Sequence, residues 1–484
     1  MAPNEEHVTK LVNADPGLPR SNPTESYWQH IPHPLANTQS PTLPIEANYA
    51  IIGSGITGLS IAKTILEKSP AARVTILEAR TLCSGATGRN GGQMAANAGE
   101  EYMHLAAMHG PEMAGRIAKF TLRNLERMQD LIEEYDAVGV SEMQRLHKLR
   151  VFLTAGKFSE FKESIKRMEG DHPSLRGLYT ILDEQTVLKL SAQDFGIHGA
   201  AGGALIPAGT VWPYSLVTKI FADLLKKYSD RFTIETNTPV LDVGHDPKST
   251  TPFPYTLRTS RGPLRAGNVI YATNGYTGHL LPSLRGSIHP FKGTMTVQDP
   301  GTLVPNQGKS VSWGFHYPPT HDPETGRSGF GLYYLGQSAK TGYFYFGGEN
   351  ARVDDTISAD DSFVGENSVS HLRDVLPRFF GENKSTAWKL VSSWSGIMGF
   401  SSDGLPLVGR LPSSISGRSG GREWIAAAFN GYGMANCLLS GEALALMALG
   451  ERVDWLPGAY GLDEKRLGSV LTAPESVKAL TAKL

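Results

Sequence analysis

The most constraining feature of this sequence is a glycine-rich turn between an apolar run and an amphipathic segment. Residues 49–52 predict a short buried parallel strand, and residues 56–68 carry apolar side chains at helical spacing. Glycines here permit a tight turn and a close approach of the backbone to a pyrophosphate, and the free N–H groups of the following helix favour an anion. The pattern predicts the first half of a dinucleotide-binding βαβ unit. The turn consists of Gly53, Ser54, Gly55, Ile56, Thr57 and Gly58.

The second half of the unit indicates which dinucleotide is bound. Residues 73–78 predict a strand ending in Glu78, whose carboxylate can accept both hydroxyls of a ribose, which favours FAD or NAD over NADP. Residues 82–93 then form a long loop of small residues, here called the small-residue loop. An NAD enzyme has no need of such a loop, whereas a flavin needs a second backbone-rich wall beside its pyrophosphate and ring. We therefore expect residues 49–93 to bind FAD.

Composition places the chain among ordinary globular proteins and excludes several classes. Its 484 residues are 40% hydrophobic and 19% charged, with a net charge of −1 and no basic run, so we expect no nucleic-acid partner. No apolar stretch reaches the ~20 residues that a membrane span needs. The two cysteines, Cys83 and Cys437, form neither a disulfide framework nor a dithiol motif. We expect no metal in the site.

The order of the predicted elements indicates an α/β fold of two interleaved domains. A Rossmann-like FAD-binding domain with a parallel sheet is expected over residues 48–140, 200–280 and 391–455. Short strands with many aromatic residues predict a discontinuous, antiparallel β-rich substrate domain over residues 141–199 and 281–390.

The two ends of the chain lie outside these domains. Residues 1–47, here called the N-terminal extension, contain eight prolines that forbid regular structure over most of their length. We expect an extended arm over the surface, ordered only if Tyr27 and Trp28 find a groove. Residues 456–484 form a C-terminal tail.

Further landmarks follow the small-residue loop in a defined order. They are Ala-Gly at 208–209, Thr-Pro-Val at 238–240, Ala-Thr-Asn-Gly at 272–275, Pro-Phe-Lys-Gly at 290–293, Trp-Ser-Gly at 394–396, Asp-Gly-Leu-Pro-Leu-Val-Gly at 403–409 and Phe-Asn-Gly-Tyr-Gly-Met at 429–434. With the loop, this series resembles the FAD-dependent D-amino-acid oxidase superfamily over residues 48–450. That superfamily includes glycine oxidase, sarcosine oxidase and the D-amino-acid dehydrogenases, and the loop is most similar to the γ-glutamylputrescine oxidoreductase branch.

The resemblance implies the two-domain fold and a set of cofactor contacts. Gly431 and Gly433 would let main-chain N–H groups approach the flavin, and the helix after them would direct its positive end at the oxygen that becomes anionic on reduction. Beside the turn residues and Glu78, the expected FAD contacts are Ala79, Arg80, Ser84, Thr87, Gly88, Arg89, Asn90, Gly91, Gly92, Val240, Ala272, Thr273, Gly275, Gly396, Asp403, Gly431, Gly433 and Met434.

The resemblance also implies where a substrate should bind. Related amino-acid enzymes hold the substrate carboxylate with arginine or lysine, but this chain has Ile397-Met398 and Met434-Ala435 at the corresponding places. We therefore expect an amine without an α-carboxylate, or a bulkier secondary amine. For any single side chain among the substrate-lining candidates, packing in the hydrophobic core is an equally good explanation. The expected substrate-lining residues are Trp212, Tyr334, Met398 and Phe400, and the expected catalytic residues are Lys292, Trp394 and Tyr432.

Together these features predict an FAD-dependent oxidoreductase that oxidises a C–N bond of a small amine or amino-acid-like substrate to an imine. Neither cysteine lies where related enzymes attach flavin covalently, so we expect non-covalent FAD. Molecular oxygen, reduced to H2O2, is the expected acceptor. Two alternatives stay open: a dehydrogenase that passes electrons to a quinone or a protein, and a flavin-binding protein without catalysis.

The last three residues suggest an address within the cell. Ala482-Lys483-Leu484 differs in one residue from Ser-Lys-Leu, the peroxisomal signal. Peroxisomes contain catalase, which removes the peroxide of an oxidase. We expect a peroxisomal protein, or otherwise a cytoplasmic one.

Overall fold

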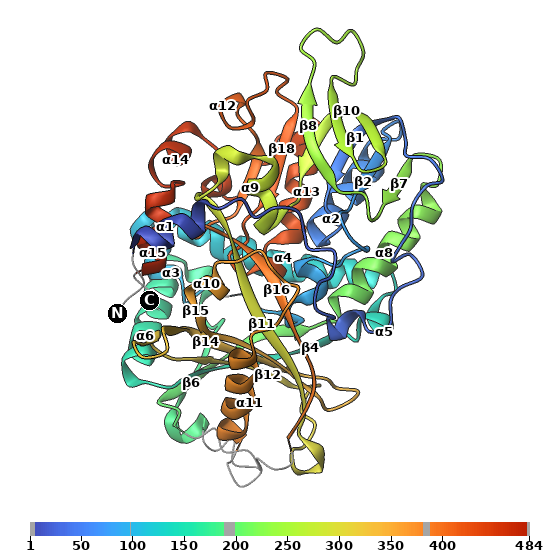
Figure 1. The fold of residues 1–484 in the computed structure, drawn as a ribbon. Coiled ribbons are helices and arrows are strands. Elements are labelled where there is room, and N and C mark those ends of the chain that lie inside the picture. The colour runs from blue at the N-terminus through green and yellow to red at the C-terminus, as the bar shows by residue number, and fades with distance from the viewer. Residues whose placement is uncertain (1–4, 97, 188–198, 381–387, 482–484) are drawn as a thin grey trace.

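The fold is built on two β-sheets formed from interleaved segments of the chain (Figure 1). The structure is a computed structural model and describes residues 5–96, 98–187, 199–380 and 388–481. The α/β class with two sheets, predicted from the order of elements, is confirmed.

The first sheet contains the predicted nucleotide-binding strands. Its strands are β1 (Glu46–Ile52), β2 (Val74–Leu77), β7 (Phe232–Glu235), β8 (Val240–His245), β9 (Tyr255–Thr259), β10 (Gly262–Tyr271), β17 (Leu407–Arg410) and β18 (Glu423–Ala427). They lie in the order β17-β18-β10-β1-β2-β7, and β8 joins through β9 at β10. The five strands from β18 to β7 are parallel, so their carboxyl ends meet at one edge, where ligands bind in open parallel sheets.

The second sheet is larger and mostly antiparallel. Its strands are β3 (Gln93–Met94), β4 (Gln144–Phe152), β5 (Thr180–Asp183), β6 (Gly202–Thr210), β11 (Ile288–Asp299), β12 (Val311–His316), β13 (Thr320–Asp322), β14 (Arg327–Gln337), β15 (Phe344–Arg352) and β16 (Lys389–Ser401). The main order is β16-β11-β15-β14-β12-β4-β6-β3. Strand β6 and residues 391–401 of β16 lie within segments that we expected in the FAD-binding domain, but the two strands pair with β4 and β11 of this sheet.

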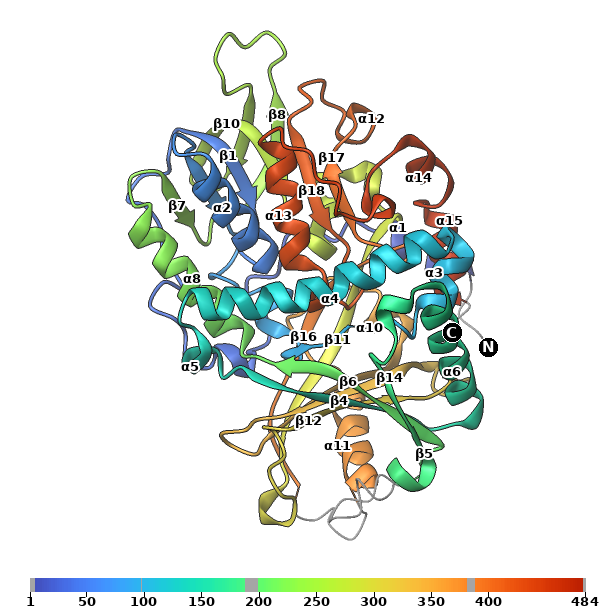
Figure 2. The same ribbon diagram turned by 180° about the vertical axis from the view of Figure 1, so that it is seen from behind.

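The helices cover the sheets and fill the space between them. They are α1 (Glu5–Asn13), α2 (Ile56–Lys68), α3 (Tyr102–His109), α4 (Pro111–Glu134), α5 (Val138–Ser141), α6 (Ala155–Asp171), α8 (Pro213–Lys227), α9 (Thr277–Leu280), α10 (Val353–Thr356), α11 (Glu366–Phe380), α12 (Ser413–Ser416), α13 (Cys437–Ala448), α14 (Glu464–Ser469) and α15 (Ala473–Thr481). Figure 2 shows α4 crossing the molecule between the two sheets, below α2 and α13.

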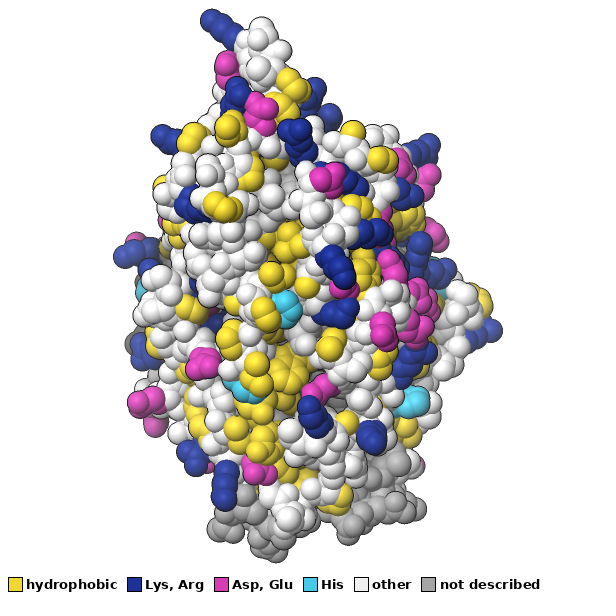
Figure 3. All heavy atoms as spheres, turned by 90° about the vertical axis from the view of Figure 1, so that its right-hand side faces the viewer, with side chains coloured by type: hydrophobic (Ala, Val, Ile, Leu, Met, Phe, Trp, Pro, Cys, Tyr) yellow, Lys and Arg dark blue, Asp and Glu magenta, His cyan; other side chains and the backbone are white. Residues whose placement is uncertain are grey.

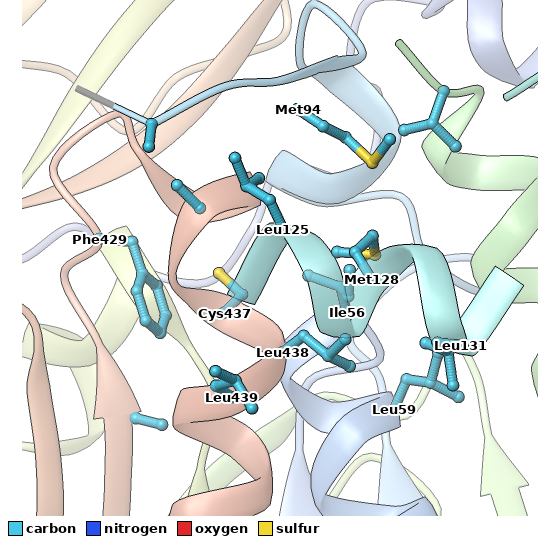
Figure 4. Close-up of a cluster of buried hydrophobic side chains, with 14 of the residues drawn as sticks. Ile56, Leu59, Met94, Leu125, Met128, Leu131, Phe429, Cys437, Leu438 and Leu439 are labelled. Carbon is cyan, nitrogen blue, oxygen red and sulfur yellow. The ribbon is translucent and has the colours of Figure 1, made fainter. Parts of the chain in front are cut away.

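A buried apolar cluster fixes the helix that begins at the glycine-rich turn. Ile56 and Leu59 of α2 meet Met128 of α4 and Leu438 of α13, all of them almost fully inaccessible to solvent (Figure 4). Burial of each such side chain contributes about 1.5–3 kcal/mol to folding. The start of α2 is therefore held rigidly at the edge of the first sheet.

The N-terminal extension is more structured than its prolines suggested. Residues 5–13 lie between the prolines at 3 and 16 and form α1, which buries Val8 and Val12 and packs beside α15. Tyr27–Gln29 forms a short 3-10 helix, and Trp28 is 5% exposed because its ring stacks on Tyr345 with centroids 4.2 Å apart. The expectation of an extended arm is wrong for α1, which is helical, whereas the burial of Trp28 meets the condition under which we expected the extension to be ordered.

The surface is of mixed charge. Figure 3 shows basic and acidic side chains interspersed over one face of the molecule. Among the described helices, none combines the length and the apolar character that crossing a bilayer requires. The tripeptide Ala482-Lys483-Leu484 lies outside the described residues.

Candidate functional site

A cavity of about 630 Å³ lies between the two sheets and receives residues from both. The glycine-rich turn, Glu78 and the small-residue loop line one part of it. Strands β11, β14, β15 and β16 line another part, and residues 429–435, just before α13, complete the wall. A site between a nucleotide-binding edge and a second sheet is able to hold a dinucleotide and a substrate together.

The turn has the geometry of a phosphate cradle. Gly53 has φ +114°, and a Cβ there would lie 2.6 Å from the carbonyl oxygen of Ala272. A Cβ on Gly58 would lie 2.1 Å from the Gly53 carbonyl oxygen, so these two glycines let the backbone pack closely. Gly55 differs from Gly53 in its ordinary φ of −71°, and because it lines the cavity, a side chain there would intrude on a ligand.

Glu78 is positioned by the same turn. Its Oε2 accepts hydrogen bonds from Ser54 N at 3.0 Å and Ser54 Oγ at 2.7 Å, and its Oε1 accepts one from Arg80 N at 3.0 Å. Each carboxylate oxygen has two acceptor positions. Oε1 therefore keeps capacity for a ribose hydroxyl at the cavity wall.

Two arginines at the cavity wall share one buried carboxylate. Arg80 Nη1 lies 2.9 Å from Asp361 Oδ2, and Arg89 Nε lies 3.6 Å from the same oxygen. Burial, together with the repulsion of the neighbouring Arg80, lowers the pKa of Arg89 to about 10, against the attraction of Asp361. The two guanidiniums and the one carboxylate leave this cluster with one positive charge in excess. Because both arginines line the cavity, this charge suits a diphosphate.

Three features of the cavity wall match the chemical groups of FAD. The turn offers the start of α2, where Gly55 provides no side-chain cap and the Ile56 N–H donates to Thr87 Oγ1 at 3.0 Å, the Glu78 carboxylate suits a ribose, and the arginine cluster supplies a compensating charge. The residues present therefore fit FAD. The residues that would hold it are the turn, Glu78, Arg80, the small-residue loop and residues 431–434.

Most of the predicted contacts face the cavity. Those that line it are Gly53, Ser54, Gly55, Ile56, Thr57, Glu78, Ala79, Arg80, Thr87, Arg89, Asn90, Gly91, Val240, Ala272, Thr273, Gly396, Gly431, Gly433, Met434, and, from the substrate and catalytic sets, Tyr334, Met398, Phe400 and Tyr432. The remaining predicted cofactor residues, which do not line it, are Gly58, Ser84, Gly88, Gly92, Gly275 and Asp403. The Asp403 carboxylate instead pairs with Arg466 at 2.8 Å.

The structure places two predicted tryptophans away from the cavity. The indole Nε1 of Trp212 donates to the Trp28 carbonyl oxygen at 2.8 Å, so Trp212 packs under the N-terminal extension. Trp394 is fully buried, and its Nε1 donates to the Arg89 carbonyl oxygen at 2.8 Å. Trp394 therefore supports the small-residue loop from behind and has no contact with the cavity.

Lys292 also points away from the cavity. Its neighbours Phe291 and Gly293 line the cavity, and side chains alternate between the faces of a strand. The Lys292 Nζ lies 3.6 Å from the centre of the Phe363 ring. The prediction of Lys292 beside the reacting atoms is not supported by this position.

Several polar side chains in the cavity wall were not predicted from the sequence. Lys148, Gln93, Glu100, His316 and Glu349 all line the cavity. Lys148 comes from β4, a strand that we did not predict. A sequence signal exists, because two basic residues, Lys148 and Arg150, alternate with apolar ones in Gln144–Phe152.

Glu100 forms ion pairs with oppositely charged side chains, whereas Lys148 forms none with the residues that the structure describes. Burial would raise the pKa of Glu100, but His316 at 2.9 Å, Arg150 and Lys148 lower it to about 2. Burial and the repulsion of Arg150 lower the pKa of Lys148 to about 7, against the attraction of Glu100. Within the described part of the chain, Lys148 Nζ has no ion pair within 4.0 Å and donates to the neutral Gln93 Oε1 at 2.7 Å.

Comparison with known proteins agrees with this geometry. Residues 48–447 match the family described as FAD dependent oxidoreductase, DAO. A protein described as probable oxidoreductase OrdL from Rhizobium meliloti is 23% identical over 429 residues, which cover 86% of this chain and 87% of that protein.

Two solved structures share the fold. Glycine oxidase from Geobacillus kaustophilus superposes with a TM-score of 0.65 at 18% identity, over 87% of this chain and 99% of that one. L-proline dehydrogenase from P. horikoshii gives a TM-score of 0.61 at 18% identity, over 87% and 97%. With the family match extending over most of its length, the chain belongs to the DAO family of FAD-dependent oxidoreductases.

Proposed function

We propose that the protein oxidises a C–N bond of a small amine that carries a carboxylate, with FAD as its cofactor and O2 as the acceptor. The observation that carries this proposal is one cavity that joins the phosphate turn at Gly55 to Lys148 and the aromatic wall of the second sheet. Fold relatives named for glycine and L-proline support amino-acid chemistry.

Bound FAD would supply the acceptor for the hydride of the C–H bond next to nitrogen. The chain would hold the substrate and exclude water. An apolar wall is available, because the Phe291 ring stacks on Phe400 at 4.6 Å and meets the edge of Phe330 at 5.1 Å. The overall reaction would convert amine, O2 and water into carbonyl product, ammonia or a smaller amine, and H2O2.

Glu349 is a candidate for accepting the proton of the substrate ammonium. Burial raises the pKa of Glu349 to about 7, although hydrogen bonds from Thr294 and Ser368 lower it in part. A general base works best with a pKa near the working pH. Glu349 lines the cavity and would leave the amine neutral, as loss of hydride requires.

Lys148 changes the expected substrate class. We inferred an amine without a carboxylate because the cations of related enzymes are absent at Met398 and Met434. Lys148 reaches the same cavity from a different strand and has no carboxylate partner within 4.0 Å among the described residues. Burial of the Lys148 ammonium is costly, as its pKa of about 7 shows, and a paired anion would offset this cost and favour the charged form, which favours a substrate carboxylate.

A comparison of amino acids with their carboxamides tests this proposal. Peroxide release would be measured for a panel of D- and L-amino acids and their carboxamides. At least one amino acid should show a kcat/KM about 10–100-fold above that of its carboxamide, since a charge-assisted hydrogen bond contributes about 1.5–3 kcal/mol. Lys148→Met should remove this preference, and Lys148→Arg should restore part of it. Lys340→Met, which removes an exposed lysine, should leave it unchanged. Equal rates for acids, carboxamides and plain amines in the unmodified enzyme would contradict the carboxylate assignment.

We further propose that FAD is bound non-covalently. Cys437 lines the cavity, but burial raises the pKa of its thiol to about 12, so the nucleophilic thiolate is scarce near neutral pH. Cys83 is fully buried and its thiol pKa is also raised by burial. Acid precipitation should therefore leave the flavin in the supernatant.

We also propose a peroxisomal location, on the basis of the terminal tripeptide Ala482-Lys483-Leu484. Removing these three residues should shift a fluorescently tagged protein, tagged at its N-terminus, from peroxisomes to the cytosol. An identical distribution of both forms would remove this proposal.

A further inference from the structure

The N-terminal extension holds the small-residue loop from its outer side. Ser26 Oγ and Gln29 Nε2 both donate to the carbonyl oxygen of Gly88, at 2.7 and 2.9 Å. Trp28 Nε1 donates to the carbonyl oxygen of Asn90 at 2.5 Å. Ser26 and Trp28 are buried, so these bonds are protected from water and are costly to leave unmade.

The loop itself is shaped to receive the extension. A Cβ on Gly88 would lie 2.3 Å from the Cys83 carbonyl oxygen and 2.5 Å from Gln29 Nε2, and a Cβ on Gly92 would lie 2.5 Å from the Val211 carbonyl oxygen and 3.1 Å from the Trp28 ring. These two glycines, which we expected to contact the flavin, instead provide room on the side away from the cavity. The loop thus has one face toward the cavity and the other against the extension.

The extension also completes the arginine cluster. Arg89 Nη2 donates to the carbonyl oxygen of Thr24 and, at 2.7 Å, to its Oγ1. The Thr24 backbone N–H donates to the carbonyl oxygen of Asp361 at 2.7 Å. The guanidinium that faces the cavity is therefore oriented by a residue of the extension.

The extension contributes to the cavity wall directly. Gly17, Leu18 and Pro19 line the cavity. They follow Asp15, whose carboxylate lies 3.0 Å from His279 Nδ1 and 2.7 Å from Arg285 Nη2. Residues 15–30 thus run from a charged anchor, along the cavity, to the outer side of the small-residue loop.

We propose that residues 15–30 are part of the cofactor site, closing the cavity over FAD and holding the small-residue loop in its binding conformation. FAD release then requires this segment to detach. The segment lies outside residues 48–447, which match the family, so the family match does not assign it. The inference depends on FAD binding and is independent of the substrate.

The rate of FAD release from the holoenzyme tests the proposal. The double variant Ser26→Ala, Trp28→Phe removes two donors to the loop but keeps an aromatic ring on Tyr345. We expect free-FAD fluorescence after dilution to rise at least tenfold faster than in the unmodified protein. Gln39→Ala serves as the matched control, because Gln39 Nε2 donates to the Thr236 carbonyl oxygen at 2.5 Å, away from the loop. It should change the rate less than twofold.

A second measurement needs no variant. Because binding equilibria are reciprocal, a segment that holds FAD must itself be held more tightly when FAD is bound. Amide hydrogen exchange over residues 15–30 should slow at least tenfold from apoprotein to holoenzyme. An unchanged exchange rate there, or a double variant that releases FAD as slowly as the Gln39→Ala control, would overturn the proposal and leave the extension a purely structural element.

Discussion

Gly55→Val should abolish FAD binding in a protein that still folds. The residue has φ −71° and ψ −179°, which valine adopts readily, so the backbone is not strained. The nearest atom to an added Cβ is the Thr87 Oγ1 at 3.0 Å, a contact that a small shift of the hydroxyl relieves. The valine methyl groups would instead occupy the cavity beside the start of α2, where a pyrophosphate must approach the backbone.

The measurement is the amount of FAD released by acid per folded chain. The unmodified protein should release stoichiometric FAD and Gly55→Val essentially none, with near-identical circular dichroism. Gly244→Val is the matched control, since Gly244 lies in β8 of the same sheet and an added Cβ meets no atom nearer than 3.8 Å. Stoichiometric FAD in folded Gly55→Val would mean that the phosphate site lies elsewhere.

Asp361→Asn should strongly destabilise the apoprotein. The carboxylate is fully buried and is the shared partner of Arg80 and Arg89. Removing one partner of a buried charged group costs about 3–5 kcal/mol, because the remaining charge stays buried without compensation. Urea unfolding of the apoprotein, followed by tryptophan fluorescence, should show a correspondingly lower midpoint.

Asp354→Asn provides the comparison for Asp361→Asn. Asp354 pairs with His7 at 2.6 Å, but both side chains are more than 40% exposed. Exposed pairs contribute about 0–1 kcal/mol, so its urea midpoint should barely move. Equal midpoints for the two variants would show that the two guanidiniums do not depend on Asp361.

The sequence predicted those parts of the site whose structure depends on residues close together in the chain. A strand, a glycine turn, a helix and an acid at the end of the next strand are read within residues 49–78, because each requirement acts between near neighbours. These residues do meet at the cavity. The contacts of Gly88 and Gly92 were harder to predict, since a glycine shows that a neighbouring group needs space but not on which side of the backbone that group lies.

The missed residues act across long distances in the chain. Asp361 joins Arg80 and Arg89 from a segment more than 270 positions away, and Lys148 enters the cavity from β4, a strand that we did not predict. For the extension, we expected an extended arm that would be ordered if Tyr27 and Trp28 found a groove; Trp28 does find one, but the helix α1 was not expected. Neither the contacts of Asp361 nor the docking of the extension leaves a periodic pattern in the sequence.

Anaerobic mixing of the holoenzyme with a carboxylate-bearing amine tests the proposed oxidation of a C–N bond directly. We expect loss of the flavin absorbance with one carbonyl product formed per flavin, and recovery of the absorbance with one H2O2 when O2 is admitted. A flavin that bleaches but recovers only with a quinone or a protein acceptor would contradict the oxidase assignment. A flavin that no amine or amino acid bleaches, in a protein loaded with FAD, would contradict oxidation of a C–N bond altogether.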